Sequence, residues 1–337
     1  MVEYLLLIGI CGLVILFAGP SIWKSIENHF GFVANSIENA DGSGTGGEDS
    51  GSTDPKADPV NGTAFAVYSD DDQSLNFYKR DSVPEVGDTF NGRKVTAVFS
   101  DLEEWDEKSA PFDGITIMST KSVLCYDSDI KLKKTENLFE GFENLEKADL
   151  RKLDVSQVTN MDSTFDNCKS LSKLDISNWD VSKVQSAFRM FYNCKSLSEL
   201  DISNWNTSSM SNMSMMIYWC KSLKNIDLSR WNTSNVSSMY NMFMGCSQLK
   251  SVGNLSDWDV SNVTAISSMF YDCDSLTDVG DLSGWDVSNV TDIHEMFSGC
   301  ESLKNVGDLS GWNTSNVKNM RDMFYRSGIT IPSWYKE

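Results

Sequence analysis

The sequence predicts an α/β repeat solenoid of seven units, preceded by a small β-rich N-terminal cap and a single N-terminal transmembrane-type helix. Three observations carry this prediction: a period of 26 or 27 residues in the C-terminal half, an apolar run at the beginning of the chain, and a polar stretch after that run. The predicted segments are an anchor over residues 1–40, a linker over 41–62, the cap over 63–144 and the solenoid over 145–337.

The anchor is predicted from the absence of charge between Tyr4 and Trp23. A helix rises about 1.5 Å per residue, so this stretch is long enough to cross ~30 Å of hydrocarbon. A cleaved secretory signal is the alternative, but no basic region precedes the run and no clear cleavage site follows it. Beyond Lys24 the apolar residues recur at steps of four and three, which predicts an amphipathic continuation to about Ala40.

The next two segments differ sharply in composition. Residues 41–62 are rich in Gly, Ser, Asp and Pro and nearly free of apolar side chains, which is typical of a flexible linker. Between 63 and 144 four apolar runs, AFAVYS, SLNFYK, KVTAVFS and ITIMST, are predicted to be strands separated by turn residues. Because the first unit of a solenoid has an open apolar end, we expect this block to cover it.

The repeat units have two halves with different periods. In the second unit Leu174 and Ile176 alternate with a polar residue, which predicts a short strand. Val184, Phe188, Phe191 and Cys194 follow at steps of four, three and three, which predicts one face of a short helix. The units begin at Leu145, Leu171, Leu197, Leu223, Leu249, Leu276 and Leu303.

When the units are aligned with one another, two positions of the repeat are interpreted as core. One holds Trp179, Trp205, Trp231, Trp258, Trp285 and Trp312, and the other holds Cys168, Cys194, Cys220, Cys246, Cys273 and Cys300. Sugar-binding tryptophans and disulfide or metal-binding cysteines are the alternatives. Because the columns lie at apolar positions and no C-x-x-C pair occurs, we expect stacked core rings and buried free thiols.

An acidic column, the Asp column, follows the predicted strands. It comprises Asp149, Asp175, Asp201, Asp227, Asp281 and Asp308, with Asn254 in between. Carboxylates on neighbouring strands lie ~4.7–5 Å apart and repel unless something bridges them. Hydrogen bonds from the following serines and turn amides are one solution. The other is a row of weak Ca²⁺ sites formed by Asp175, Asp201, Asp227, Asp281 and Asp308.

The unit pattern LxxLDxSxW, followed by SxVxxM and MFxxC, resembles the BspA-like leucine-rich repeats of bacterial surface proteins over about residues 145–328. The block AVYS to SLNFYKRDSVPEVGDTFNGRKVTAVF resembles the segment that often precedes those repeats. The resemblance implies a leucine-rich-repeat-like fold and a cell-surface or secreted protein that binds host or microbial partners. It implies no catalytic residues.

The start Met1-Val2-Glu3-Tyr4, followed at once by the apolar run, resembles the mature end of a type IV pilin, most closely the short Flp pilins of tight-adherence (Tad) systems. This resemblance implies that Glu3, followed by Tyr4, enters the membrane with the helix and pairs with the terminal amine of a neighbouring subunit. Glu3 lies two places earlier than the family's usual spacing. An ordinary anchor with Glu3 at the membrane interface is the alternative.

Composition narrows the function. A net charge of −20 opposes nucleic acid or anionic lipid as the main partner. Because there are only two histidines and no recognisable nucleophile–base pair or metal cluster, we expect neither an enzyme nor a cofactor beyond the Ca²⁺ considered above.

We therefore predict a surface-displayed adhesin that binds an extracellular protein or glycan through its solenoid. The alternative is a pilin or pseudopilin subunit that assembles with other pilin subunits into a fibre displaying the solenoid. The expected location is the cell surface, with the chain anchored in the membrane by its N-terminal helix or associated with a fibre. Candidate partner-binding residues vary between units: Lys173, Glu199, Lys224 and Thr277 on the strands, and Tyr240, His294 and Arg321 on the helices.

Overall fold

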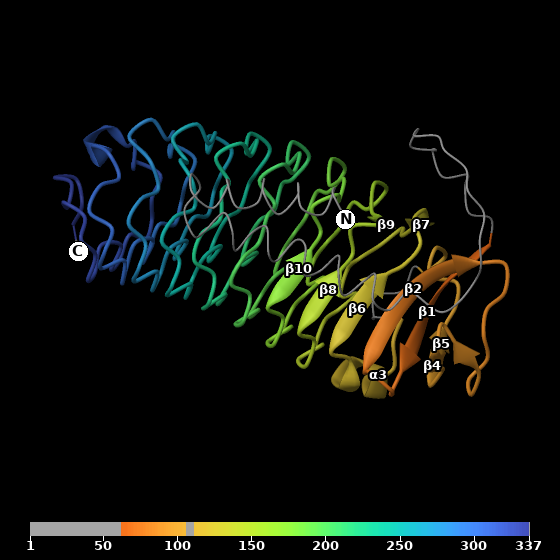
Figure 1. The fold of residues 1–337 in the computed structure, drawn as a ribbon. Helices are drawn as coiled ribbons and strands as arrows, with labels where there is room; N and C mark the ends of the chain where they lie inside the picture. Colours follow the sequence, from red (N-terminus) through yellow and green to blue (C-terminus); the bar gives the residue numbers. More distant parts are fainter. Residues whose placement is uncertain (1–61, 106–110, 337) are drawn as a thin grey trace, which may run out of the picture. The chain divides into compact units, whose positions relative to one another are not determined.

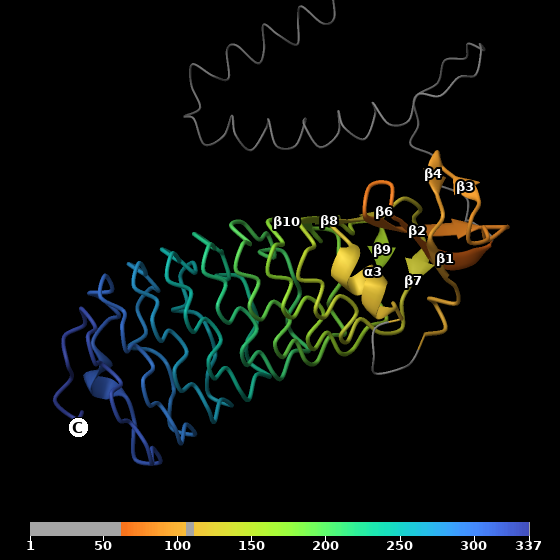
Figure 2. The ribbon, with the colours of Figure 1, turned by 90° about the horizontal axis from the view of Figure 1, so that it is seen from below.

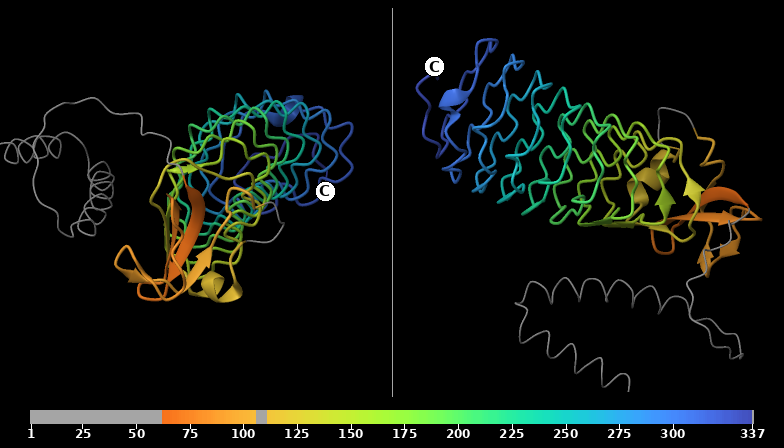
Figure 3. Two further views of the ribbon diagram at one scale, coloured as in Figure 1. Left: turned by 90° about the vertical axis from the view of Figure 1, so that its right-hand side faces the viewer. Right: turned by 90° about the horizontal axis from the view of Figure 1, so that it is seen from above.

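The computed structural model describes residues 62–105 and 111–336, which form a parallel repeat solenoid (Figure 1). Successive coils of the chain lie side by side from the N-terminal sheet to the C-terminus, and seen end-on they follow one another closely (Figure 3). The predicted anchor and linker, with Glu3 and Tyr4, lie outside the described residues. Within those residues no helix is long and apolar enough to cross a membrane.

A six-stranded sheet begins the solenoid, in the order β10-β8-β6-β2-β1-β5. β1 pairs with β2 and β5 in antiparallel fashion, whereas β2–β6, β6–β8 and β8–β10 are parallel pairs. The sheet therefore changes from a hairpin to the parallel wall of the coils without a break (Figure 1). The strands are β1 Thr63–Ser69, β2 Ser74–Arg80, β5 Ala97–Phe99, β6 Ser122–Cys125, β8 Lys147–Asp149 and β10 Lys173–Asp175.

One of the four predicted strands is wrong. The run ITIMST forms the helix α3 (Gly114–Ser119), because the Asp113 carboxylate caps it by accepting the Thr116 N–H at 2.7 Å (Figure 2). The remaining elements are two small pairs and a 3-10 turn: β3 Thr89–Phe90 with β4 Arg93–Lys94, β7 Ile130–Lys131 with β9 Leu153–Asp154, and η1 Leu309–Gly311.

Each coil has three sides. The strand face continues beyond β10 through bridges that join Asn225, Ser251 and Asp278. A second parallel ladder joins Asn160, Ser186, Asn212, Ser238, Ala265, Asp292 and Asn319. We call the third side the turn face; in the coil that begins at Leu171 it comprises residues 187–194. Hydrogen bonds between coils run along it, as from the Phe191 N–H to the Met216 carbonyl at 2.8 Å.

The predicted helical halves are wrong. Over residues 145–336, all of them described, the only helical element is the 3-10 turn η1. The turn face is a run of tight turns, such as the Met190 N–H to the Ala187 carbonyl at 3.2 Å. On the turn face of each coil two residues have positive φ, as Arg189 (57°) and Asn193 (61°) do. Ser, Asn and Gly favour such turns over helix, and the pairing of coils satisfies the backbone groups that a helix would satisfy internally.

Most side chains that were predicted to face the interior are nevertheless buried. Ala187, Met190 and Phe191 are fully buried, whereas Phe188, which we had assigned to the buried face, is only half-buried. Phenylalanine rings stack from coil to coil, as Phe243 and Phe270 do at 5.4 Å. These stacks form a continuous core along the solenoid.

The tryptophan column is core, as predicted. Its six indoles are 3–5% exposed, and most of them donate an N–H to a carbonyl of the preceding coil, as Trp285 does to Leu255 at 3.0 Å. The cysteine column is also core, and its six members are buried free thiols. Each donates its S–H to the preceding coil, as Cys246 does to the Ile217 carbonyl at 2.9 Å, and burial raises the pKa of every one.

Four apolar residues near the end of the sequence, Ile329, Ile331, Trp334 and Tyr335, are predicted to close the open end of the last coil, and three of them do so. Trp334 stacks on Trp312 at 6.4 Å and donates its indole N–H to the Leu309 carbonyl at 2.7 Å. Tyr335 packs edge-on against Phe324 at 5.2 Å. Ile329 is buried but Ile331 is 55% exposed, so the prediction fails for Ile331.

Candidate binding surface

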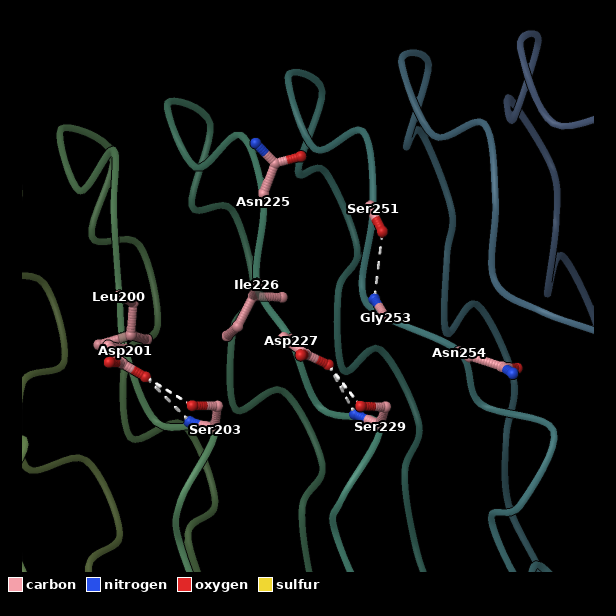
Figure 4. A pocket seen from close by; sticks show the side chains of 10 residues that line it. All are labelled: Leu200, Asp201, Ser203, Asn225, Ile226, Asp227, Ser229, Ser251, Gly253 and Asn254. Carbon is pink, nitrogen blue, oxygen red and sulfur yellow. Dashed lines mark hydrogen bonds between the residues drawn. The ribbon is translucent and has the colours of Figure 1, made fainter. Parts of the chain in front are cut away.

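The Asp column occupies the strand face, and all of its carboxylates except that of Asp149 are held by the serines two residues further on. Asp227 accepts the Ser229 N–H at 3.0 Å and its hydroxyl at 2.7 Å, and the same pair of bonds joins Asp201 to Ser203 (Figure 4). These hydrogen bonds lower the pKa of Asp227, and bonds of the same kind lower the pKa of Asp281 and Asp308. The hydrogen-bonded solution predicted from the sequence is therefore confirmed.

The calcium row is not tested by this geometry and stays a prediction. Within residues 62–105 and 111–336 no three His, Cys, Asp or Glu side chains are grouped so that they could hold a metal ion. At the N-terminal end of the column, Arg151 joins Asp149 and Asp175 through contacts of 2.7 and 3.1 Å. Its guanidinium bridges the two carboxylates and offsets part of their repulsion.

A shallow hollow lies on the strand face across three coils (Figure 4). Its lining is mixed, and its two carboxylates, Asp201 and Asp227, accept the serine hydrogen bonds described above while keeping their negative charge. Its lining residues are Leu200, Asp201, Ser203, Asn225, Ile226, Asp227, Ser229, Ser251, Gly253 and Asn254.

The four strand-face candidates are exposed and lie in two neighbouring columns. Lys173 and Glu199 share one column, and Lys224 and Thr277 share the next. The Lys250 N–H donates to the Lys224 carbonyl at 2.8 Å, and the Thr277 N–H donates to the Lys250 carbonyl at 3.1 Å, which fixes their order. They are spread along the solenoid and do not converge on one point.

The other three candidates share one column of the turn face, since the predicted helices are absent. Tyr240 and His294 are half-buried, and Arg321 is exposed. The His294 ring nitrogen Nδ1 lies 2.6 Å from Asp292 Oδ1, and Arg321 Nε lies 3.2 Å from Asp322 Oδ2. These two side chains are already engaged by carboxylates of their own coils.

A different group on the turn face was missed by the sequence analysis. It combines three aromatic rings with three cations from adjacent coils, and we call it the ring–cation cluster. Its members are Arg189, Tyr192, Lys195, Tyr218, Trp219 and Lys221.

The tyrosines form the first part of the cluster. Tyr192 and Tyr218 stack with centroids 4.6 Å apart and planes 5° apart. The Arg189 guanidinium lies 4.0 Å from the Tyr192 centroid and also contacts the buried Asp166 carboxylate at 2.9 Å. Burial raises the pKa of Asp166 to about 6, although Arg189 opposes this effect.

Trp219 forms the second part. Its ring lies 5.9 Å from that of Tyr218, and the Lys221 and Lys195 ammonium groups lie 4.5 and 5.7 Å from its centroid. Trp219 has a φ of 57° and is 37% exposed. The equivalent residue has positive φ in the neighbouring coils too, as Asn193 and Gly245 do, so Trp219 is a bulky side chain at a strained position of the turn.

The next coil makes room for this indole. Gly245 follows Trp219 in the same column, and a Cβ on Gly245 would lie 2.1 Å from the Trp219 Cδ1 atom. The glycine therefore allows Trp219 to lie flat over its backbone.

The two lysines of the cluster, unlike Arg189, are not paired with carboxylates. Lys169, one coil before Lys195, pairs with Glu143 at 2.5 Å. Among the described residues, Lys195 and Lys221 have no such ion pair, and both lie over the Trp219 ring instead. Cation–π contacts hold a cation in place without cancelling its charge.

A signal for this cluster was present in the sequence. The segments FYNCKS and IYWCKS place a tyrosine two residues before the cysteine and a lysine directly after it in two consecutive units. We assigned the column next to the cysteine to a helix, and that assignment gave no reason to look for aromatic side chains at the surface.

The coils and their surface define the chain as a repeat-solenoid protein. A family model described as "Mycoplasma protein of unknown function, DUF285" matches residues 112–225, 197–280 and 247–330. These overlapping matches cover well over half of the chain, so the chain belongs to this family. No curated protein matches it.

Two solved structures are similar at low identity. A leucine-rich repeat protein from Eubacterium ventriosum ATCC 27560 is 14% identical with a TM-score of 0.28, and the match covers 82% of this chain and 96% of that one. A leucine-rich repeat protein from Bacteroides ovatus ATCC 8483 is 14% identical with a TM-score of 0.19, and the match covers 81% and 88%.

Proposed function

We propose that the chain is a surface-displayed adhesin, a protein without catalytic activity that binds an extracellular protein or glycan through its solenoid. The ring–cation cluster is the observation that carries the proposal. It exposes a strained tryptophan and two ammonium groups without carboxylate partners, on a frame whose core columns repeat from coil to coil. Repeat proteins acquire specificity by varying surface residues on such a fixed frame.

The proposal includes the finer architecture. Residues 145–337 form seven leucine-rich-repeat-like units of the BspA-like type, and residues 63–144 cover the open apolar end of the first. The parallel pair β6–β8 and the stacking of Phe139 on Phe165 at 5.3 Å support this arrangement. A solenoid without such cover would expose its core rings.

The proposed attachment rests on sequence alone. Residues 1–40 anchor the protein in the membrane, and residues 41–62 form a linker that lets the solenoid reach beyond the surface. The alternative function is a pilin or pseudopilin subunit, which the start Met1-Val2-Glu3-Tyr4 favours. In that case Glu3 and Tyr4 take part in fibre assembly.

Two measurements test the proposal. Electron microscopy of native cells labelled with an antibody to residues 145–328 should show label confined to the envelope. Label along filaments would overturn the single-chain anchor in favour of the pilin, and Glu3→Ala should then abolish the filaments. The purified full chain should also bind at least one member of a panel of extracellular proteins and glycans, and binding to none of them would refute the adhesin.

A further inference from the structure

We propose that the ring–cation cluster binds an anionic glycan, a polysaccharide whose sugars carry carboxylate or sulfate groups. This inference rests on the proposed adhesin function and names the ligand class of that surface.

The cluster presents positive charge on an acidic protein. The chain carries a net charge of −20, yet the turn-face segments of the two coils that form the cluster, residues 187–194 and 213–220, contain no Asp or Glu. Lys195 and Lys221 are held over the Trp219 ring, and a cation held by a ring keeps its attraction for an anion. The rings also limit the freedom of the lysine side chains, which lowers the entropy lost on binding.

The spacing of the two lysines favours a sugar chain. They directly follow Cys194 and Cys220, so they recur at the same position of successive coils. The Asn193 N–H donates to the Tyr218 carbonyl at 2.7 Å, which shows that these coils are direct neighbours. Hydrogen-bonded neighbours lie ~4.7–4.9 Å apart. This spacing is close to the length of one sugar in an extended polysaccharide.

An acidic peptide fits the same spacing less well. Side chains on one face of an extended peptide recur at roughly 6.5 Å, twice the rise per residue of a strand. Successive carboxylates on one face of such a peptide would therefore fall out of register with the coils, whereas the length of one sugar matches the distance between two coils.

The surface beyond the cluster limits the length of the site. After Gly245 the positions equivalent to Trp219 and Lys221 are occupied by Asp272 and Asp274, and Glu301 follows one coil later. These carboxylates repel a polyanion. The site therefore takes a short anionic stretch and excludes a ligand that runs along the whole solenoid.

The test is the binding of the full chain to immobilised chondroitin sulfate, with dextran as the neutral glycan and poly-glutamate and duplex DNA as other polyanions. We expect binding to chondroitin sulfate that weakens as salt is added. Lys195→Gln combined with Lys221→Gln should weaken it at least tenfold. Lys250→Gln combined with Lys304→Gln, which removes two exposed lysines from the strand face, is the matched control and should leave binding unchanged.

A second pair of variants tests the position of the ring. Gly245→Asn places a side chain against the Trp219 indole and should also weaken binding at least tenfold. Gly141→Asn is its control, because Gly141 has a similar φ, 78° against 75°, and its nearest neighbour to a new Cβ lies 3.9 Å away. Asn tolerates this backbone conformation, and circular dichroism verifies that both variants fold.

The outcomes separate this inference from the function on which it rests. Equal binding to poly-glutamate or duplex DNA would overturn it, because the site would then recognise charge alone. Binding that the lysine pair and Gly245→Asn leave intact would also overturn it. Capture of a neutral glycan or a protein alone would overturn it while the adhesin stands, whereas binding to no member of the wider panel would refute both.

Discussion

Two neighbouring tryptophans of the core column differ in one hydrogen bond, and this difference predicts different costs of substitution. Trp205 and Trp231 stack on each other at 6.3 Å and are 5% and 4% exposed. The Trp231 indole N–H donates to the Ile202 carbonyl at 3.1 Å. The Trp205 indole N–H is buried and has no partner among the described residues.

Replacing either residue by Phe removes a similar ring area and the same stacking contact. Trp231→Phe additionally loses a hydrogen bond worth about 1 kcal/mol, whereas Trp205→Phe removes an unsatisfied buried donor whose burial costs about 1–3 kcal/mol. We therefore expect Trp231→Phe to lower the free energy of unfolding by at least about 2 kcal/mol more than Trp205→Phe does.

The assay is urea unfolding of both variants, followed by far-UV circular dichroism. Equal slopes against urea concentration are needed for the comparison, because repeat proteins unfold in parts when their cooperativity is lost. A cost for Trp205→Phe as large as that for Trp231→Phe would refute the hydrogen-bond assignment of the column.

Three further predictions concern stability and reactivity. Because burial raises the pKa of Asp166 from 3.8 to about 6, its stabilising contribution is complete below pH 4 and is lost as the pH rises through 6. Between pH 4 and 7 the free energy of unfolding of the wild type should fall by about 3 kcal/mol relative to that of Asp166→Asn, at about 1.4 kcal/mol per pKa unit. A difference between the two proteins that stays constant over this pH range in urea unfolding would contradict the prediction. The six thiols of the cysteine column should resist a maleimide reagent in the native protein and react after unfolding, as followed by mass spectrometry, and rapid native labelling would show that they are accessible. Gly280→Ala should lower stability by about 2 kcal/mol, because Gly280 has a φ of 83° and a Cβ would lie 1.9 Å from Asn254 Oδ1, whereas Gly284→Ala, where nothing lies within 4 Å, should be nearly neutral in thermal unfolding.

The sequence was sufficient to predict the repeat and its core. Apolar residues that recur at one place in every unit face the interior in any stacked arrangement, so the burial of Trp285 and Cys246 did not depend on the correct secondary structure. The same holds for the hydrogen bonds of the Asp column, because an aspartate two residues before a serine forms them within a single turn.

The helical halves could not be rejected from periodicity alone. Steps of three are shared by a helix face and by consecutive tight turns, and the hydrogen bonds that decide between them come from the next coil. The composition gave a warning, since Ser and Asn are frequent in these segments and residues such as Asn193 adopt positive φ.

The ring–cation cluster was missed for the same reason. Trp219 and Lys195 are 24 positions apart in the sequence and meet only because neighbouring coils place equivalent positions side by side. Once the coils are aligned, their adjacency follows from the repeat itself.

Chemical labelling of lysines tests the proposed binding site most directly. The full chain is acetylated with and without chondroitin sulfate, and the modification of each lysine is followed by mass spectrometry. Slower labelling of Lys195 and Lys221 in the presence of the glycan, with Lys224 and Lys250 unchanged, is the predicted result. Protection of Lys224 and Lys250 instead would place the ligand on the strand face and contradict the account.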